Sequence, residues 1–247
     1  MDSWSMAAEI AGAFLLAGFV KGAIGLGLPT VAIGLLVLAM TPAQAAAIIV
    51  VPSLVTNVWQ AAAGGALLPL LRRLWPLLAG ICAGTGLGVL LLPGAMGNEA
   101  ILWLGIALAV YALLGLFRVQ FSVPKRGEIW LGALVGLATG VITVATGVFS
   151  IPAVPFIQAL HLDRDRLVQA LGLSFTVSTI MLAAALSHAG GIGWSLAMPA
   201  LLALACSIAG MLLGQVVRGR VAPKTFRLAF LLGLLALGLH LAIRGLL

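Results

Sequence analysis

The chain has 247 residues, of which 63% are hydrophobic and 8% are charged, whereas ordinary soluble domains carry about 25% charged residues. So little charge excludes a water-soluble enzyme, a disordered chain and a nucleic-acid-binding protein, because the apolar side chains could not be covered in water. The net charge of +7 instead indicates membrane topology, since the basic residues gather in short segments between apolar stretches, as in cytoplasmic loops.

Two long stretches without Asp, Glu, Lys or Arg indicate several membrane crossings. Residues 22–71 and 167–217 contain no such residue over 50 and 51 positions. One spanning helix needs about 20 apolar residues, so each stretch holds more than one crossing. The strongest apolar runs are continuous and do not alternate, which favours helices over strands. We expect an all-α, polytopic transmembrane bundle.

The expected helices fall into the same five pieces in each half of the chain. In the first half they cover residues 6–24, 29–40, 42–64, 75–92 and 99–117, and in the second half 128–145, 150–160, 164–187, 194–216 and 226–245. Thr41 and Pro42 are typical of an N-cap and a first-turn proline. A helix over 29–40 would be about 18 Å long, too short to cross about 30 Å of hydrocarbon. Each half therefore contains a broken or re-entrant helix pair plus three spans.

An internal repeat accompanies this division. Residues 18–22, 25–30 and 53–57 resemble residues 136–140, 145–152 and 174–178, with offsets of 118 for Gly18 and Gly136 and 121 for Ser53 and Ser174. Further anchors at an offset of 124 pair Cys82 with Cys206 and Gly86 with Gly210. We expect two transmembrane repeats, residues 1–124 and 125–247.

Loop charges predict the side of the membrane on which each connection lies. The basic segments 72–73, 118–126, 161–166 and 218–227 are expected inside, and the segments 93–98 and 188–193, which have no basic residue, outside. Corresponding loops of the two halves then lie on opposite sides, so the repeats have inverted topology.

The two Gly-rich breaks, residues 22–29 and 140–152, are candidate anion sites. Pro29 and Pro152 mark helix amino termini inside the membrane, where unpaired N–H groups and the helix dipole attract anions. The alternative is that the glycines only permit close helix packing, as expected for Gly80, Gly84 and Gly88. The candidate binding residues in the breaks are Gly22, Gly25, Gly27, Thr30, Thr143, Thr146, Gly147 and Ser150.

Neutral polar residues form a stripe on the helix after each break. Ser53, Thr56, Asn57 and Gln60 share one face of the first such helix, and the second carries Ser174, Thr176, Ser178 and Thr179. Such groups can replace the hydration of an oxyanion, although any one Ser or Thr can instead bond a carbonyl of its own helix. Asn and Gln are costly in lipid, so we expect the first stripe to face a cavity.

Lys21 lies at the end of the first helix, next to the break. It either pairs with an anionic substrate or extends its side chain to the inner interface. No carboxylate falls in the middle of a span, which argues against carriers of cations or metals and against proton pumps with a buried Asp or Glu.

On residues 18–29 and 136–152, and on the helices that carry Ser53 and Ser174, the chain resembles the TauE/SafE family, the sulfite exporter or toluene sulfonate uptake permease family. The resemblance covers nearly the whole chain. It implies a multi-pass carrier in a bacterial or archaeal inner membrane that moves sulfite, organosulfonates or related small anions, usually outward.

The expected function is therefore secondary transport of a small sulfur oxyanion by alternating access. An anion channel and a carboxylate carrier remain alternatives, whereas an intramembrane enzyme is disfavoured because no H-E-x-x-H, G-x-S-x-G or membrane-embedded Asp pair is present. We expect no cofactor, no metal and no nucleic-acid partner; the partners are the anion and the lipid bilayer, and a homodimer is left open. The sequence leaves the anion, the coupling ion and the direction of transport undetermined.

Overall fold

The computed structural model describes residues 3–94, 96–97, 99–117, 122–217 and 223–246, and the regular structure of this part of the chain is helical. The helices are α1 (Ser3–Ile24), α2 (Leu28–Leu36), α3 (Pro42–Ala62), α4 (Leu67–Leu91), α5 (Ala100–Leu116), α6 (Glu128–Thr146), α7 (Ala153–Ala159), α8 (Arg164–His188), α9 (Ala197–Val217) and α10 (Pro223–Leu246), with a 3-10 turn at Trp194–Leu196. The all-α fold is confirmed. Residues 118–121 and 218–222, parts of two predicted inner loops, lie outside the described residues.

Seven of the described helices are long and apolar enough to cross a membrane: α1, α3, α4, α6, α8, α9 and α10. The chain is thus a multi-pass membrane protein. α5 is apolar but has only 17 residues, and α2 and α7 have 9 and 7. The short segments confirm the broken helices expected after each Gly-rich region.

The start of α4 differs from the expectation. The helix begins at Leu67 instead of residue 75, so Arg72 and Arg73 lie on a helix and not in a loop. Arg73 is neutralised by Glu128 at the start of α6, with Nε to Oε1 at 2.6 Å and Nη2 to Oε2 at 3.0 Å. The two hydrogen bonds to the Glu128 carboxylate offset the charge of Arg73, so that α4 can include this residue near its start. The hydropathy of the sequence alone did not indicate this.

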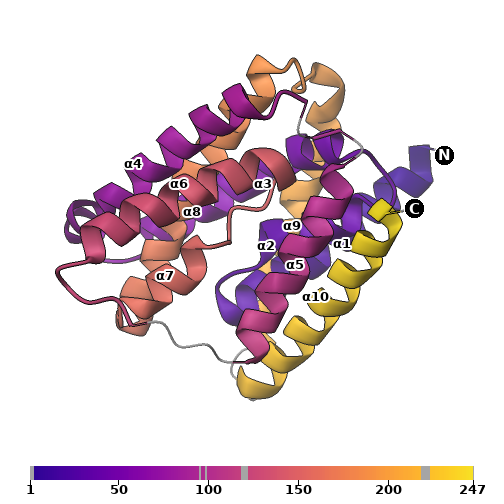
Figure 1. Ribbon diagram of the computed structural model, residues 1–247. Helices are drawn as coiled ribbons and strands as arrows, with labels where there is room; N and C mark the ends of the chain where they lie inside the picture. The colour runs from indigo at the N-terminus through magenta and orange to yellow at the C-terminus, as the bar shows by residue number, and fades with distance from the viewer. Residues whose placement is uncertain (1–2, 95, 98, 118–121, 218–222, 247) are drawn as a thin grey trace.

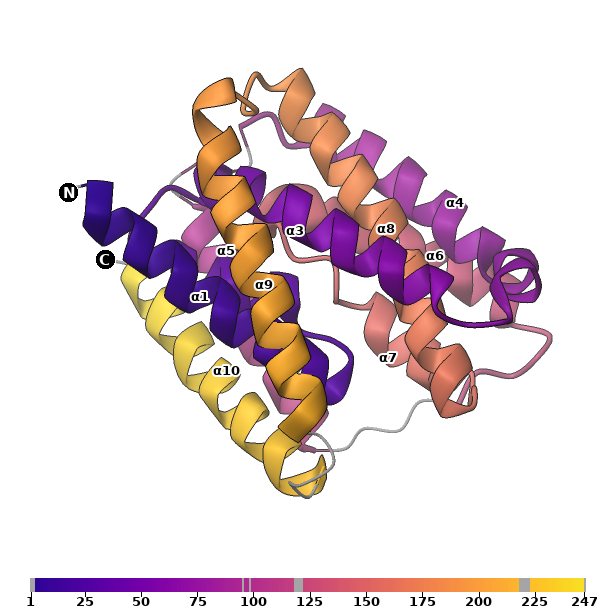
Figure 2. The ribbon, with the colours of Figure 1, turned by 180° about the vertical axis from the view of Figure 1, so that it is seen from behind.

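The helices pack in pairs drawn from opposite halves of the chain. α1 packs on α9, α4 on α6, α5 on α10 and α3 on α8. Figures 1 and 2 show α5 and α10 side by side at one edge, with α4 and α6 at the other edge. α3 also contacts α9, and α8 also contacts α4, so the α3–α8 pair joins the two sides of the molecule.

Glycines bring all four of these pairs into backbone contact. A Cβ on Gly22 would lie 2.1 Å from the carbonyl oxygen of Met211 in α9, and one on Gly84 would lie 2.1 Å from that of Leu137 in α6. Gly80 makes a similar approach to Ala133, so the packing role expected for the α4 glycines is confirmed. Gly140 also lies in the α4–α6 contact, and α6 continues to Thr146; the second break therefore begins at Gly147 and not at Gly140.

The two glycines paired at an offset of 124 do not make equivalent contacts. A Cβ on Gly86 would meet nothing within 4 Å, whereas one on Gly210 would lie 2.2 Å from the Leu15 carbonyl oxygen. Gly80 makes a contact comparable to that of Gly210, since a Cβ there would lie 2.4 Å from the Ala133 carbonyl oxygen. The offset changes along the chain for two reasons: α8 has 25 residues against 21 in α3, and residues 189–196, the connection before α9, are more numerous than residues 63–66, the connection before α4.

Candidate functional site

Left-handed glycines interrupt the chain at both breaks. Gly25 and Gly27 have φ of 83° and 102° between α1 and α2, and Gly147 has φ of 71° at the end of α6. Residues with a Cβ rarely adopt these backbone angles, which explains why a glycine follows the end of each helix. Pro29 lies in the first turn of α2, and Pro152 immediately precedes α7. The predicted positions of both prolines at helix amino termini are confirmed.

The two breaks meet inside the protein. Thr30 Oγ1 and Ser150 Oγ are 2.9 Å apart, and both side chains are buried. Gly147 faces Ile33 of α2 so closely that a Cβ would lie 2.3 Å from its Cδ1. Helix α2 therefore contacts residues 147–150, in the segment between α6 and α7, through a pair of hydroxyl groups and an apolar side chain.

Lys21 is held in the interior by α3. Its side chain is only 4% exposed, and Nζ donates to Thr56 Oγ1 at 3.0 Å and to Asn57 Oδ1. Asn57 Nδ2 donates in turn to Thr179 Oγ1 at 3.4 Å, which joins α1, α3 and α8. We call these four residues the Lys21 network. The alternative that Lys21 extends to the membrane interface is wrong, because its ammonium group points to buried oxygens.

The polar stripe on α3 is the element that positions this network. Ser53, Thr56 and Asn57 are at most 1% exposed, so their common face packs inside the protein and not against lipid. Gln60, one turn further on, donates from Nε2 to the Gly25 carbonyl oxygen at 2.8 Å. The stripe thus holds both Lys21 and the break that follows it.

The partners of Lys21 in the described structure carry no charge. The ion pairs in this part of the chain join Arg73 to Glu128 and Arg166 to Asp163, away from Lys21. Removing an ammonium group from water is costly unless a negative charge compensates it. An anion that reached the Lys21 network would supply this missing charge.

Three buried hydroxyl groups on α3 and α8 add further hydrogen-bonding capacity. The Oγ atoms of Ser53, Ser174 and Ser178 have no hydrogen-bond partner among the described residues, and all three side chains are fully buried. Ser53 shares a helix face with Asn57, and Ser174 shares one with Ser178, since each pair is four residues apart. Unpaired buried hydroxyls are unusual in proteins and can donate to an oxyanion.

Other predicted site residues serve the scaffold. Gly22 packs against α9, as described above. Thr143 and Thr146 donate to the carbonyl oxygens of Thr139 and Ile142 in their own helix, at 2.7 and 2.8 Å. Thr146 also accepts from the Val148 amide at 3.1 Å, which closes the end of α6. For these residues the structure favours the packing and own-helix alternatives.

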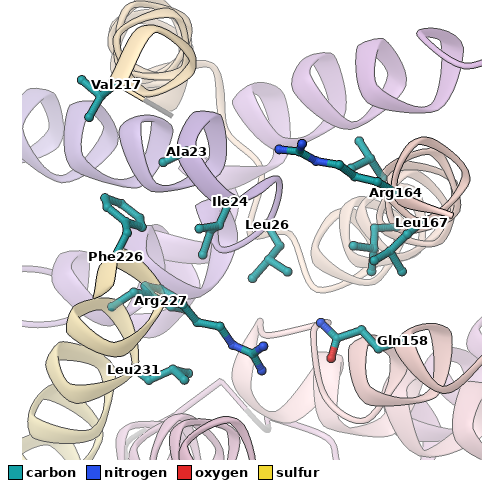
Figure 3. A pocket seen from close by; sticks show the side chains of 13 residues that line it. Ala23, Ile24, Leu26, Gln158, Arg164, Leu167, Val217, Phe226, Arg227 and Leu231 are labelled. Atoms are coloured by element: carbon teal, nitrogen blue, oxygen red, sulfur yellow. The ribbon is translucent and has the colours of Figure 1, made fainter. Parts of the chain in front are cut away.

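A cavity of about 240 Å³ was not expected from the sequence. It lies at the end of the molecule where α1, α7 and α9 finish and where α8 and α10 begin. Figure 3 shows Gln158, Arg164 and Arg227 projecting toward this space from three different helices. We call it the arginine cavity. The basic residues had been interpreted as topology signals, and no local pattern links positions so far apart in the chain.

The comparison with family models is consistent with this architecture. The model described as "Sulfite exporter TauE/SafE" matches residues 10–241, nearly the whole chain. Searches of curated proteins and of solved structures found no match. Because the matched region includes both breaks and the Lys21 network, this multi-pass membrane protein belongs to the TauE/SafE family, a family of transporters and not of enzymes.

Proposed function

We propose that this protein is a secondary carrier that moves a small sulfur oxyanion, such as sulfite or an organosulfonate, out of the cell across the inner membrane. The observation that supports this most directly is the buried ammonium group of Lys21, which has only uncharged partners in the described structure. Family membership supports the class of substrate.

In this proposal the anion binds where α1, α3 and α8 meet. An oxygen of the anion replaces Asn57 Oδ1 on the Lys21 ammonium, and the freed Asn57 side chain can still donate from Nδ2. Hydroxyl groups of Ser53, Ser174 and Ser178 are the candidates for the remaining oxygens. Neutral donors suit a carrier, because they compensate for lost hydration without holding the anion as tightly as several fixed charges would.

Transport by alternating access requires two related conformations, and inverted repeats provide them. Exchanging the halves turns the α1–α9 pair into the α6–α4 pair and leaves the α3–α8 and α5–α10 pairs unchanged. Thr30 and Ser150, which bond each other, are 120 positions apart, the same offset as Gly27 and Gly147. These correspondences support the proposal that residues 1–124 and 125–247 are inverted repeats.

The Thr30–Ser150 contact then joins equivalent positions of the two proposed repeats. In our proposal α2 slides there against residues 147–152, the segment that leads into α7, while the outer pairs, joined by backbone contact at glycines, move as rigid units. Gln60, bonded to the Gly25 carbonyl, couples this movement to the Lys21 network.

Counterflow in proteoliposomes tests the function. Purified protein is reconstituted into liposomes, which are loaded with sulfite, thiosulfate, sulfoacetate, sulfate or a carboxylate, and uptake of the labelled anion is followed. We expect saturable, trans-stimulated uptake for at least one sulfur oxyanion. Conductance without trans-stimulation would indicate a channel, counterflow of carboxylates alone would indicate a carboxylate carrier, and no counterflow for any anion would refute the proposal.

A further inference from the structure

The arginine cavity combines a hollow with positive charge. Arg164 is the first residue of α8, and Arg227 lies in the second turn of α10. Neither forms an ion pair in the described part of the chain, and no Asp or Glu is among the described residues that line the cavity. Two uncompensated guanidinium groups therefore face one cavity of about 240 Å³.

The placement of Arg164 in the first turn of α8 is electrostatically unfavourable for the protein itself. Cations near helix amino termini are repelled by the positive end of the helix dipole. Acidic residues are available at the same end, since Asp163 and Asp165 flank Arg164, but Asp163 pairs with Arg166. Basic residues that only set the orientation of the chain in the membrane could lie anywhere near the inner ends of the helices. Because Arg164 and Arg227 instead face the same cavity, the arrangement points to a ligand with negative charge.

The cavity borders the break that leads to the Lys21 network. Ile24 and Leu26, on either side of Gly25, form part of its lining. The Gly25 carbonyl accepts the hydrogen bond from Gln60, and Lys21 lies one helical turn earlier in α1. An anion in the cavity would thus be separated from the Lys21 network by the last turn of α1.

The opposite end of the molecule has a different cavity. Its volume is about 600 Å³, and its described lining, which includes Ala43, Val144 and His188, contains no Lys, Arg, Asp or Glu. It lies beside the end of α6 as the arginine cavity lies beside the end of α1, so the two correspond under exchange of the halves. The positive charge is confined to one of the two.

We infer that Arg164, Arg227 and Gln158 form an oxyanion-binding vestibule that captures the transported anion at the inner end before it passes to Lys21. This inference rests on the proposed function. Two guanidinium groups can donate several charge-assisted hydrogen bonds to the oxygens of a sulfonate or sulfite, and the Gln158 amide can donate one more. The vestibule cannot change the equilibrium distribution of the anion; it raises capture at one end, which suits a carrier that loads from the cytoplasm.

The phosphate of an anionic lipid offers the same oxyanion chemistry, and basic cavities between membrane helices can bind lipid headgroups. We favour the transported anion because the cavity adjoins the break in α1. A test must therefore compare bilayers with and without anionic lipid.

Protection of a cysteine inside the vestibule provides the test. Leu167 lines the cavity and is half-buried. Leu167→Cys is made in a full-length background with Cys82→Ser and Cys206→Ser and reconstituted into nanodiscs of pure phosphatidylcholine or with added phosphatidylglycerol. N-ethylmaleimide labels the cysteine; it is uncharged, so removing arginines does not change its attraction. Methanesulfonate is the probe, because sulfite would react with the maleimide.

We expect methanesulfonate to slow labelling in phosphatidylcholine, and replacement of either arginine by glutamine to raise the concentration for half-protection about tenfold. The matched control is Arg72→Gln, an exposed arginine on α4 outside the cavity lining, which should leave protection unchanged. Thermal unfolding of the same samples checks that the variants keep their fold. Protection is expressed relative to each variant's own labelling rate without methanesulfonate, because removing a nearby guanidinium also lowers the thiolate fraction of the introduced cysteine.

Two results would overturn the inference. One is no protection by methanesulfonate in phosphatidylcholine together with slower labelling in phosphatidylglycerol, which assigns the cavity to lipid. The other is full protection after both arginines are replaced. Counterflow is measured on the same variants reconstituted into liposomes, and it separates the two proposals: protection without any counterflow refutes the carrier function, whereas counterflow without protection refutes the vestibule.

Discussion

Replacing Lys21 by glutamine removes the positive charge from the interior while keeping an amide that can donate to Thr56 or Asn57. Lys21→Met keeps the length of the side chain but donates no hydrogen bond, so Asn57 Oδ1 loses its partner. The two variants therefore separate the role of the charge from that of the hydrogen bonds.

The expected magnitudes follow from the contacts. A hydrogen bond from a charged group contributes about 1.5–3 kcal/mol, so Lys21→Gln should weaken apparent anion affinity about ten- to a hundredfold. The empty protein should not be destabilised by this change, since its Lys21 is buried to 4% exposure without a carboxylate partner. Lys21→Met should in addition lower the free energy of unfolding by about 1–3 kcal/mol, the cost of leaving a buried polar group unpaired.

Counterflow as a function of anion concentration gives the apparent affinity, and thermal unfolding in detergent gives the stability of the same samples. Exposed Arg72→Gln serves as a control for the loss of one positive charge elsewhere. An apparent affinity of Lys21→Gln equal to that of the natural protein would refute the assignment of Lys21 to the anion site, whatever the stability result.

Three further predictions concern the fold around the site. Gly84→Ala places a Cβ 2.1 Å from the Leu137 carbonyl oxygen and should lower the free energy of unfolding by about 1–3 kcal/mol. Gly86→Ala meets nothing within 4 Å and should leave the free energy of unfolding unchanged or raise it by up to about 1 kcal/mol. Equal unfolding midpoints for the two variants would contradict the packing argument. A double-mutant cycle of Thr30→Val and Ser150→Ala should give a coupling of about 1 kcal/mol in unfolding free energy, and zero coupling would deny their hydrogen bond. Reporter fusions at residues 42 and 164 should report opposite faces of the membrane; the same face for both would end the inverted-topology proposal.

Most helices could be predicted because their ends carry local chemistry. Thr41 accepts from the Gln44 amide and is followed by Pro42, so the start of α3 depends on neighbours within one turn. The breaks follow from glycines that adopt φ values few other residues tolerate. α4 began earlier than expected because the partner of Arg73 is Glu128, 55 positions away, and no local pattern contains that ion pair.

The site was predicted in part for the same reason. The spacing of Ser53, Thr56 and Asn57 places them on one helix face, and because polar residues are scarce in this apolar chain, they are candidates for a binding site. That this face meets Lys21 and Thr179 depends on how α1 and α8 cross α3. Thr143 and Thr146 were candidates because they lie in the second Gly-rich break, yet both bond within their own helix, which a sequence pattern cannot distinguish from an open site.

Composition alone determined the solvent of this protein, because 8% charge cannot keep so apolar a chain in water, and the lengths of its uncharged stretches determined that it crosses the membrane repeatedly. Tertiary structure decided which polar groups meet. Helix crossings buried Lys21 among neutral oxygens, and they brought Arg164 and Arg227, 63 positions apart, to one cavity. The physical reason is that the burial preference of a segment is a sum over its own residues, which the sequence lists directly. A binding site depends on contacts between distant segments, which the order of residues along the chain does not specify.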